Sequence, residues 1–438
     1  MLSSPTPIAL SPDLYGHAEV VAPLDNPPED SLRAMSSSNP PPLHLTADMR
    51  RLSTPWPICL MRAEQLAERR LAEGKVLDPA CGSGMQLFAY CARLRRPGIG
   101  IEIDSDAALL AAANGRRIAD VHGDTWVDDS KVLVGDGLDA AAAIASVRAN
   151  GRIISVLHVD PARPRDAQRH SLDEMEPPLS RLLSVWSPYL AEGPAGPGLI
   201  IDLSPRLSEE HMLEVEQLLH SSWPDAPLTW EWVSTGHGRI DRLTVWFGSA
   251  ADPRCDARIL RLLASGEVYC LGGSSDCPVA EIGAPPREGE WLTIVDTALV
   301  AAGLHDEWIE RALPRKSEHR WLRSEGRRPL LLSSAEPRMH DPEVDAFVAS
   351  TGKVVGRVKR PPTVANIDSL LVTIRSAYLS KLTLRCSLDP DEQPNIQREL
   401  DRAMRIYPRG RRGFLVDLPT DDGINWFVCV EPDGSTSR

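Results

Sequence analysis

The sequence predicts an α/β protein: a mostly parallel sheet with an antiparallel hairpin at its edge, followed by a smaller C-terminal α+β domain. Between residues 75 and 160, short apolar runs alternate strictly with Ala-rich runs of helical periodicity, as in right-handed strand-helix-strand units. At residues 228–248, two aromatic runs of alternating polarity flank a glycine-containing turn, which is typical of an antiparallel hairpin. Beyond residue 340, four strand-like runs surround two helical stretches.

Each element of the predicted sheet follows from its own run of residues. A helix opens it, with apolar residues at near-helical spacing from Ile58 to Leu71 and Gly74 as its C-terminal cap. The first strand leads into KVLDPACGSG. The remaining elements are, in order, MQLFAYCARLR (helix), GIGIEID (strand), SDAALLAAANGRRIA (helix), KVLVGD (strand), GLDAAAAIASVRAN (helix), RIISVLHVD (strand), PPLSRLLSVWSPYL (helix), PGLIIDLS (strand) and SEEHMLEVEQLLHSSW (helix).

We expect five segments along the chain of 438 residues. Residues 1–48 are rich in Pro and Ser and have no sustained period, so we predict a largely disordered tail. Residues 49–250 form the sheet domain, 251–335 a connecting segment, 336–432 the α+β domain and 433–438 a second tail. The sequence leaves open whether residues 251–335 fold independently.

The composition excludes several classes of protein. With 42% hydrophobic and 25% charged residues, the chain has an ordinary globular composition. It has no run of 18 apolar residues and no signal-like N-terminus, so we expect no membrane span and a cytoplasmic location. The eight cysteines are scattered without a close CxxC pair, which indicates reduced thiols and no metal site.

Charge is unevenly distributed along the chain. The net charge of −13 argues against indiscriminate binding to nucleic acid. Residues 311–328 nevertheless carry seven Lys or Arg against two Glu, and residues 398–413 carry six Arg against two acids. Such runs are either solvated faces or surfaces that bind a polyanion.

A glycine-containing turn, DPACGSG at residues 78–84, lies between the first strand and the helix after it. Glycines there allow the backbone to approach a ligand, in the crevice outside the carboxyl ends of parallel strands. The dinucleotide fingerprint GxGxxG would need a third glycine where this chain has Leu87, which weakens a nicotinamide interpretation.

Acidic residues stand at the ends of four successive strands: Asp78, Glu102, Asp136 and Asp160. Any one of them is more often the N-cap of the following helix than a ligand-binding group. A single turn chemistry does not explain Glu102, which is followed at once by Ile103 and Asp104. Glu102 could accept hydrogen bonds from both ribose hydroxyls of a nucleoside.

On these residues the sequence resembles the class I S-adenosylmethionine-dependent methyltransferases. VLDPACGSG, GIGIEID, VGDGLD and VDPAR look like their successive strand-end motifs. The resemblance implies a Rossmann-like sheet and S-adenosyl-L-methionine as cofactor, with the methionine part near the glycine turn, the ribose on Glu102 and the adenine edge on Asp136. The cofactor-binding residues predicted in this way are Asp78, Ala80, Gly82, Gly84, Glu102, Ile103, Asp136, Gly137 and Asp160.

A narrower resemblance, to methyltransferases with a C-terminal THUMP-like domain, covers five segments between Thr54 and Pro390. They are TPWPICLMRAEQLA, DPARPRDAQRHSLDEMEPPLS, WEWVSTGHGRIDRLTVWFG, GEWLTIVDTALVAAGL and SKLTLRCSLDP. This resemblance implies structured RNA, either tRNA or rRNA, as the partner and substrate. Two alternatives stay open: a non-catalytic RNA-binding protein with a degenerate methyltransferase domain, and a methyltransferase of small molecules or proteins.

The catalytic residues implied by the resemblance are Asp160, Pro161, Ala162 and Arg163. In the matching motif of base amino-methyltransferases, a carboxylate or amide accepts the amino hydrogens and an aromatic residue stacks on a flipped base. This chain has Arg163 where that aromatic stands. A guanidinium can stack on a base, pair with a phosphate or form a salt bridge. No cysteine stands directly after Asp160-Pro161, so covalent attack by a thiolate on a pyrimidine base is poorly supported. An amino nitrogen is therefore the favoured acceptor, with a ribose oxygen open. The oligomeric state does not follow from the sequence.

Overall fold

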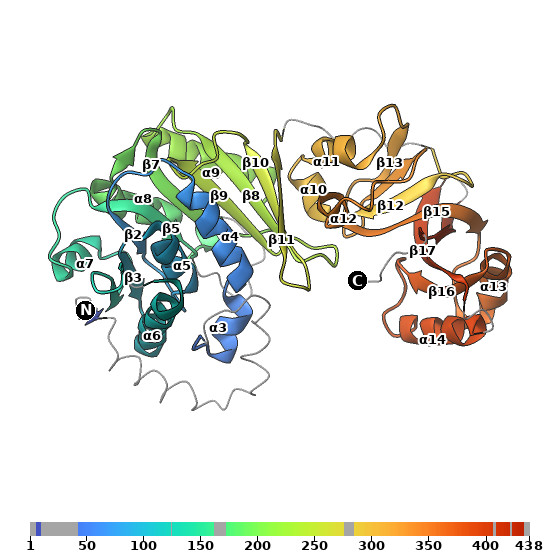
Figure 1. The fold of residues 1–438 in the computed structure, drawn as a ribbon, viewed down its shortest axis with the longest axis horizontal. Coiled ribbons are helices and arrows are strands. Elements are labelled where there is room, and N and C mark those ends of the chain that lie inside the picture. The colour runs from blue at the N-terminus through green and yellow to red at the C-terminus, as the bar shows by residue number, and fades with distance from the viewer. Residues whose placement is uncertain are drawn as a thin grey trace. The chain divides into compact units, whose positions relative to one another are not determined.

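The computed structural model describes residues 6–9, 43–123, 125–161, 172–275, 284–405, 409–420 and 423–432. Ala162 and Arg163, two of the predicted catalytic residues, lie outside these ranges. The chain divides into two compact units. The first comprises residues 1–233 and 240–273, and the second comprises residues 234–239 and 274–438. Each unit is built on its own sheet (Figure 1).

The first unit contains one large sheet and the helices that pack on it. Its strands are β1 (Thr6–Ala9), β2 (Lys75–Asp78), β3 (Gly98–Glu102), β4 (Lys131–Val134), β5 (Ile154–Val159), β6 (Glu192–Gly193), β7 (Gly196–Leu203), β8 (Leu228–Ser234), β9 (Arg242–Gly248), β10 (Ala257–Leu262) and β11 (Val268–Gly273). Its helices are α3 (Ala47–Leu52), α4 (Trp56–Ala67), α5 (Met85–Leu94), α6 (Ser105–His122), α7 (Ala140–Ser146), α8 (Leu179–Trp186) and α9 (Glu209–Ser222), with short 3-10 turns at Leu172–Glu174 and Ser187–Tyr189.

The strand order of this sheet is β1-β4-β3-β2-β5-β7-β9-β8-β10-β11. The five strands β4, β3, β2, β5 and β7 run parallel, and β9 and β8 follow antiparallel. The predicted fold class is therefore confirmed: a mostly parallel sheet with an antiparallel hairpin beside it. A second antiparallel hairpin, β10–β11, continues the sheet beyond the predicted one.

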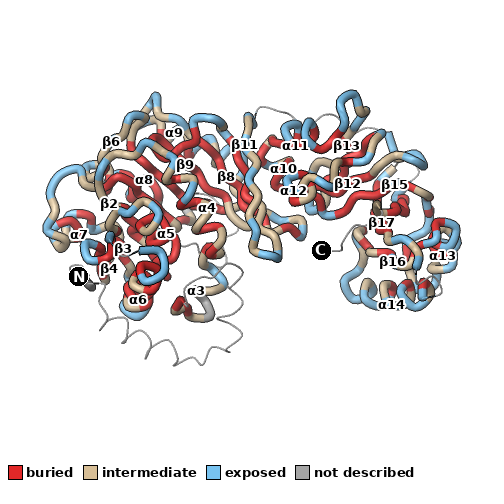
Figure 2. The backbone as a smooth tube through the Cα atoms, in the orientation of Figure 1, coloured by how far each residue is buried: buried red, intermediate tan, exposed pale blue. Residues whose placement is uncertain are grey.

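Burial explains why these strands read as nearly continuous apolar runs. All residues of β5 are buried, because a parallel sheet is covered on both faces. On one face, α4, α5 and α6 share a single hydrophobic cluster with side chains of the central strands. Figure 2 shows the buried residues running along the strands and through α5. The first helix is shorter than predicted: α4 ends at Ala67, and Gly74, with φ +141°, belongs to the turn before β2.

Part of the region predicted to be a disordered tail has defined structure. Thr6–Ala9 form β1, which pairs antiparallel with β4. Leu43 and Leu45 are buried. The side chain of Asn114 on α6 accepts a hydrogen bond from the amide of His44 and donates one to its carbonyl. The Asn114 amide also donates to the carbonyl of Ser83, so it ties residues 43–45 to the glycine turn.

The second unit is a smaller α+β domain, as the sequence predicts, but its continuous part begins at residue 274, before the predicted start at residue 336. Its sheet has the order β13-β14-β12-β15-β18-β17-β16. The strands are β12 (Trp291–Val295), β13 (His319–Arg323), β14 (Leu330–Ser333), β15 (Val348–Val358), β16 (Leu379–Leu384), β17 (Arg411–Thr420) and β18 (Gly423–Val430). The helices are α10 (Thr297–Ala301), α11 (His305–Ala312), α12 (Pro342–Asp345), α13 (Ile367–Ser376) and α14 (Gln393–Met404), with a 3-10 turn at Val364–Asn366.

Residues 251–335, whose independent folding the sequence left open, are divided between the two units. Strands β10 and β11 belong to the first sheet, whereas β12, β13 and β14 belong to the second. Apolar side chains of β12–β14 share one cluster with those of β17 and β18, so the second sheet curls around its own core.

Within the described residues, no helix is long and apolar enough to cross a membrane.

Candidate functional site

The four predicted acids lie at one edge of the first sheet. Asp78 and Glu102 end β2 and β3, Asp136 follows β4 by two residues, and Asp160 follows β5 by one. Since these four strands are neighbours and parallel, their carboxyl ends open onto the same edge. The structure therefore brings together residues that are 82 positions apart, from Asp78 to Asp160.

The glycine turn lies directly above this edge and leads into α5. Gly82 and Gly84 have φ values of +50° and +71°, in the left-handed region that favours glycine. A Cβ on Gly84 would come within 2.8 Å of the Phe88 ring, so both backbone and space require glycine there. The amide of Cys81 donates to the carbonyl of Ile101 at 3.0 Å, which fixes the turn to β3.

Glu102 faces the glycine turn. Its Oε2 accepts a hydrogen bond from the amide of Gly82, and its Oε1 accepts one from the amide of Asp104, each at 3.0 Å. A carboxylate offers about four lone-pair positions, so two positions stay open for further donors. Ile103 lies beside it with 66% of its surface exposed, which leaves a large apolar side chain at the rim of the site.

Asp136 and Gly137 form the loop after β4, and this loop lies against the glycine turn. Asp136 Oδ1 accepts from the amide of Leu138 at 2.9 Å, as in a local turn. A Cβ on Gly137 would lie 2.0 Å from the carbonyl oxygen of Pro79, so only glycine permits this approach. The indole of Trp186 donates to the Gly137 carbonyl at 2.9 Å and fixes the loop from the other side.

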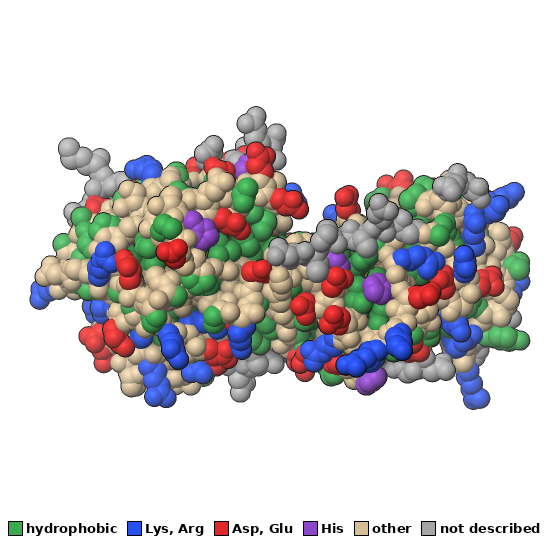
Figure 3. Space-filling view, turned by 90° about the horizontal axis from the view of Figure 1, so that it is seen from above, with side chains coloured by type: hydrophobic (Ala, Val, Ile, Leu, Met, Phe, Trp, Pro, Cys, Tyr) green, Lys and Arg blue, Asp and Glu red, His purple; other side chains and the backbone are tan. Residues whose placement is uncertain are grey.

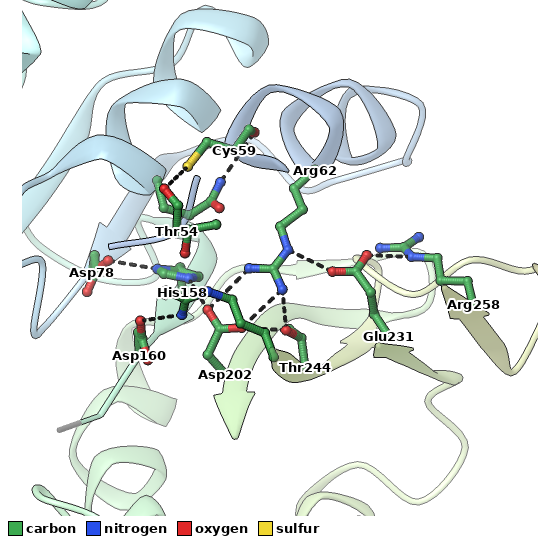
Figure 4. Close-up of polar contacts among 12 residues, drawn as sticks. Thr54, Cys59, Arg62, Asp78, His158, Asp160, Asp202, Glu231, Thr244 and Arg258 are labelled. Atoms are coloured by element: carbon green, nitrogen blue, oxygen red, sulfur yellow. Dashed lines mark hydrogen bonds and ion pairs between the residues drawn. The ribbon is translucent and has the colours of Figure 1, made fainter. Parts of the chain in front are cut away.

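Asp78 lies beneath the turn, not at its surface. It is 3% exposed; its Oδ1 accepts from the amide of Ala80 at 3.0 Å, and its Oδ2 lies 2.7 Å from Nδ1 of His158. His158, on β5, reaches Asp202 Oδ2 with its Nε2 at 3.2 Å. His158 thus bridges two buried carboxylates, one on β2 and one on β7 (Figure 4).

The bridge continues into a larger buried network. Arg62 of α4 donates to both Oδ1 and Oδ2 of Asp202, at 3.2 and 3.3 Å, and to Glu231 of β8 at 2.7 Å. Arg258 of β10 donates to the other oxygen of Glu231 at 2.7 Å. These side chains are at most 3% exposed. Six charged groups, Asp78, His158, Asp202, Arg62, Glu231 and Arg258, form one connected chain under the sheet edge (Figure 4).

The network favours the charged forms of His158 and Asp202. Burial is the largest single influence on the pKa of His158, and it opposes protonation. The charge of Asp78 and the hydrogen bonds with Asp202 and Asp78 together outweigh it and raise the pKa of His158 to about 10. Burial likewise opposes ionisation of Asp202, yet Arg62, His158 and Arg242 hold the pKa of that carboxyl far below its usual range. His158 is therefore an imidazolium between two carboxylates at neutral pH.

Asp160 is partly exposed at the rim of the site. Its Oδ2 lies 3.4 Å from a terminal nitrogen of Arg242 on β9, and Arg242 also donates to the carbonyl of Leu52 at the end of α3. Pro161 is buried. This arrangement connects the carboxylate to the segment before α4, and the hydroxyl of Ser53 in that segment donates to the hydroxyl of Ser83 at 3.3 Å.

The sequence predicts the acids at the strand ends. It does not predict the buried network of His158, Arg62, Asp202 and Glu231. Each is a polar residue inside an otherwise apolar strand or helix face, as in SVLHVD and LIIDLS, and that is the signal that could have found them. Cys81 is buried, and burial raises the pKa of its thiol well above the usual range, so it packs as a small apolar residue. Among the residues that the structure describes, no cluster of His, Cys, Asp and Glu could hold a metal ion.

The comparisons with known proteins give a match in fold but none in sequence. No protein-family model matches the sequence, and no curated protein matches it. Among solved structures, the chain is similar to a protein of Porphyromonas gingivalis W83 described as a candidate methyltransferase, with a TM-score of 0.56 and 17% identity over 96% of this chain and 98% of that one.

Two further similarities are weaker. A candidate class I S-adenosylmethionine-dependent methyltransferase of Listeria monocytogenes matches with a TM-score of 0.32 and 14% identity, over 56% of this chain and 71% of that one. The rRNA methyltransferase aviRa of Streptomyces viridochromogenes matches with a TM-score of 0.32 and 17% identity, over 48% of this chain and 89% of that one. The Porphyromonas protein matches along almost the whole chain, so this chain shares its fold.

Proposed function

We propose that this protein is an S-adenosylmethionine-dependent methyltransferase. The observation that carries the proposal is the sheet edge: Glu102 lies against the glycine turn with two lone-pair positions open, while Asp136 and Asp160 follow the neighbouring strands. The carboxyl ends of four adjacent strands thus offer carboxylates, together with a glycine turn whose backbone a ligand can approach closely. This arrangement suits an elongated nucleoside ligand that extends along the edge.

The residues present fit the cofactor in three respects. Among the described residues, no atom lies within 4 Å of the position where a Cβ on Gly82 would stand, so a ligand can approach its backbone closely. Glu102 carries the open acceptor positions that a ribose diol needs. Ile103 is an exposed apolar side chain next to that acid, and the flat face of a base would cover it.

We assign the parts of the cofactor to these groups. Glu102 holds the ribose, Ile103 and the loop of Asp136 and Gly137 hold the adenine, and the turn of Ala80, Gly82 and Gly84 holds the methionine part, supported from below by Asp78. When bound, S-adenosylmethionine supplies an electrophilic methyl group. The contribution of the chain is to orient this group and the acceptor in line and to exclude water.

We assign Asp160 as the residue that positions the acceptor. It stands at the rim, beyond the end of β5, and Arg242 fixes its orientation. A carboxylate in this place accepts hydrogen bonds from a base amino group and leaves the nitrogen lone pair directed at the methyl group. Pro161, Ala162 and Arg163 complete the proposed catalytic segment, with Arg163 as a stacking or phosphate-pairing group.

We further propose structured RNA, tRNA or rRNA, as the substrate and a THUMP-like role for the second unit. The support is the resemblance of segments reaching Pro390 and the basic content of that unit, in which residues 311–328 carry seven Lys or Arg. On the face seen in Figure 3, Lys and Arg side chains of this unit gather in small groups with acidic side chains nearby. Such groups neutralise phosphates without demanding a sequence.

The experiment is a calorimetric titration of the purified full-length protein with S-adenosylmethionine. S-adenosylhomocysteine and NADH serve as comparison ligands. The proposal expects saturable binding of the first two ligands and none of NADH. A protein that binds neither S-adenosyl compound would refute it. Binding of RNA fragments that weakens steeply as salt rises would support the proposed substrate.

A further inference from the structure

We infer that His158 is a positioning residue for the cofactor: as an imidazolium it fixes Asp78, and through Asp78 it fixes the start of the glycine turn that receives the methionine part. The inference rests on the proposed function and deepens it. It assigns a role to a buried histidine that does not itself contact the substrate or the cofactor.

The two contacts of His158 require both ring nitrogens to be donors. Nδ1 lies 2.7 Å from Asp78 Oδ2, and Nε2 lies 3.2 Å from Asp202 Oδ2. A neutral imidazole carries one N–H and could serve only one of two ionised carboxylates. Asp202 is held ionised by Arg62, which donates to both of its oxygens. The doubly protonated ring is thus the form that satisfies the geometry.

Asp78 transmits this constraint to the turn. Its second oxygen accepts the amide of Ala80, so the carboxylate connects β5 to the second residue after β2. The orientation of the carboxylate decides whether that hydrogen bond forms. Without His158, Asp78 Oδ2 would be a buried oxygen without its nearest donor, a state that costs enough to make the side chain rotate away from the Ala80 amide.

The surroundings leave His158 little freedom to move. Tyr90 of α5 packs edge-on against its ring, with 5.6 Å between ring centroids. The side chain of His158 is 3% exposed, and those of Asp78 and Asp202 are 4% and 3% exposed. The ring is therefore clamped between β2, β7 and α5. A group so constrained can define the position of the turn before any ligand arrives, which is the benefit of preorganisation.

The chain provides a matched control in the second unit. His305 is also buried, at 1% exposed, and its ring packs edge-on against Trp321 with 5.6 Å between centroids. In contrast to His158, its Nδ1 has no hydrogen-bond partner among the described residues. Replacing either histidine by glutamine removes a buried ring of the same size, but only His158→Gln removes the bridge between two carboxylates.

The test compares His158→Gln, His305→Gln, Asp78→Asn and the double variant Asp78→Asn/His158→Gln, as full-length proteins, by calorimetry with S-adenosylmethionine. We expect His158→Gln to raise the dissociation constant at least tenfold and His305→Gln to leave it within twofold. Because His158 acts through Asp78, the double variant should bind within about twofold of Asp78→Asn alone. A folded His158→Gln that binds like the wild type overturns the inference, and so does a double variant whose loss is the product of the two single losses.

A second measurement needs no variant. In wild-type protein labelled with ¹⁵N at histidine, NMR at pH 8 should show both ring nitrogens of His158 protonated, and a neutral tautomer would overturn the inference. The two proposals fail differently. A wild type that binds no S-adenosylmethionine overturns the proposed function and this inference with it. A wild type that binds the cofactor while His158→Gln binds it equally well overturns this inference alone.

Discussion

His158 Nδ1 lies 2.7 Å from Asp78 Oδ2, so a histidine two residues before Asp160 holds the carboxylate that begins the glycine turn. This contact joins the two halves of the proposed site. The turn and the acceptor-positioning segment emerge from neighbouring strands, β2 and β5, and the His158–Asp78 pair lies between those strands below the edge. Substitutions at the network and at the rim should therefore have separable effects.

The first prediction concerns pH. The folded-state pKa of His158 is raised from 6.5 to about 10, so between these values the folded protein holds a proton that the unfolded chain has released. The stabilisation is complete below pH 6.5 and is lost as the pH rises towards 10. Linkage gives a slope of about −1.4 kcal/mol per pH unit from this one group. Urea unfolding of the wild type between pH 6.5 and 9.5 measures the slope.

The control for this prediction is His158→Gln, which lacks the titrating ring. Its free energy of unfolding should fall less steeply with pH than that of the wild type over the same interval. Equal slopes in the two proteins would show that His158 is neutral in the folded state.

The second prediction concerns Arg62. Arg62→Met leaves Asp202 and Glu231 buried without their shared counter-charge, which should lower the free energy of unfolding by about 3–5 kcal/mol. The matched control is Arg93→Met, because the Arg93–Glu64 pair has side chains 49% and 57% exposed. Exposed pairs contribute about 0–1 kcal/mol. Chemical denaturation of both variants tests the contrast, and similar losses in the two would contradict it.

The third prediction concerns the cofactor-binding acids. Glu102→Ala removes the acceptor that faces the glycine turn, and Asp136→Ala removes the carboxylate after β4, so each should weaken S-adenosylmethionine binding at least tenfold in calorimetry. Asp139→Ala is the control, because the Asp139 side chain caps α7 by accepting from the amide of Ala142. Removing a cap costs about 1 kcal/mol of stability but should leave the affinity within twofold. Unchanged affinity in both Glu102→Ala and Asp136→Ala would refute the site.

The fourth prediction concerns close approach. A Cβ at residue 137 would lie 2.0 Å from the Pro79 carbonyl, so Gly137→Ala must push the loop after β4 away from the glycine turn. We expect weaker cofactor binding, by about tenfold, in a protein that remains folded. Gly123→Ala is the control, because the positive φ of +100° disfavours alanine there, but among the described residues no atom lies within 4 Å of its Cβ position. Equal affinities in the two variants would mean that the loop and turn do not contact the ligand together.

Much of the first sheet could be predicted because its signal is local. The alternation of apolar runs and Ala-rich runs fixes strand and helix in turn, and the acids at the strand ends follow from position alone. The buried network could not be predicted, because Arg62 and Glu231 are 169 residues apart and His158 and Asp78 are 80 apart. A polar residue inside an apolar strand shows that a partner must exist, but its identity depends on which strands become neighbours.

The same reason explains the division of residues 251–335. The runs that form β10 and β12 read equally well as strands, and nothing local states which sheet each will join. Segment 43–45 was missed for a similar reason, since its burial depends on Asn114 of α6, 70 residues away from His44.

The measurement that tests the central claim most directly is transfer of a labelled methyl group from S-adenosylmethionine to RNA isolated from cells that lack the protein. The wild type should label the RNA, whereas Asp160→Ala should still bind S-adenosylmethionine but leave the RNA unlabelled. A wild type that binds the cofactor and labels no RNA, or an Asp160→Ala variant that labels RNA at the wild-type rate, would contradict the account.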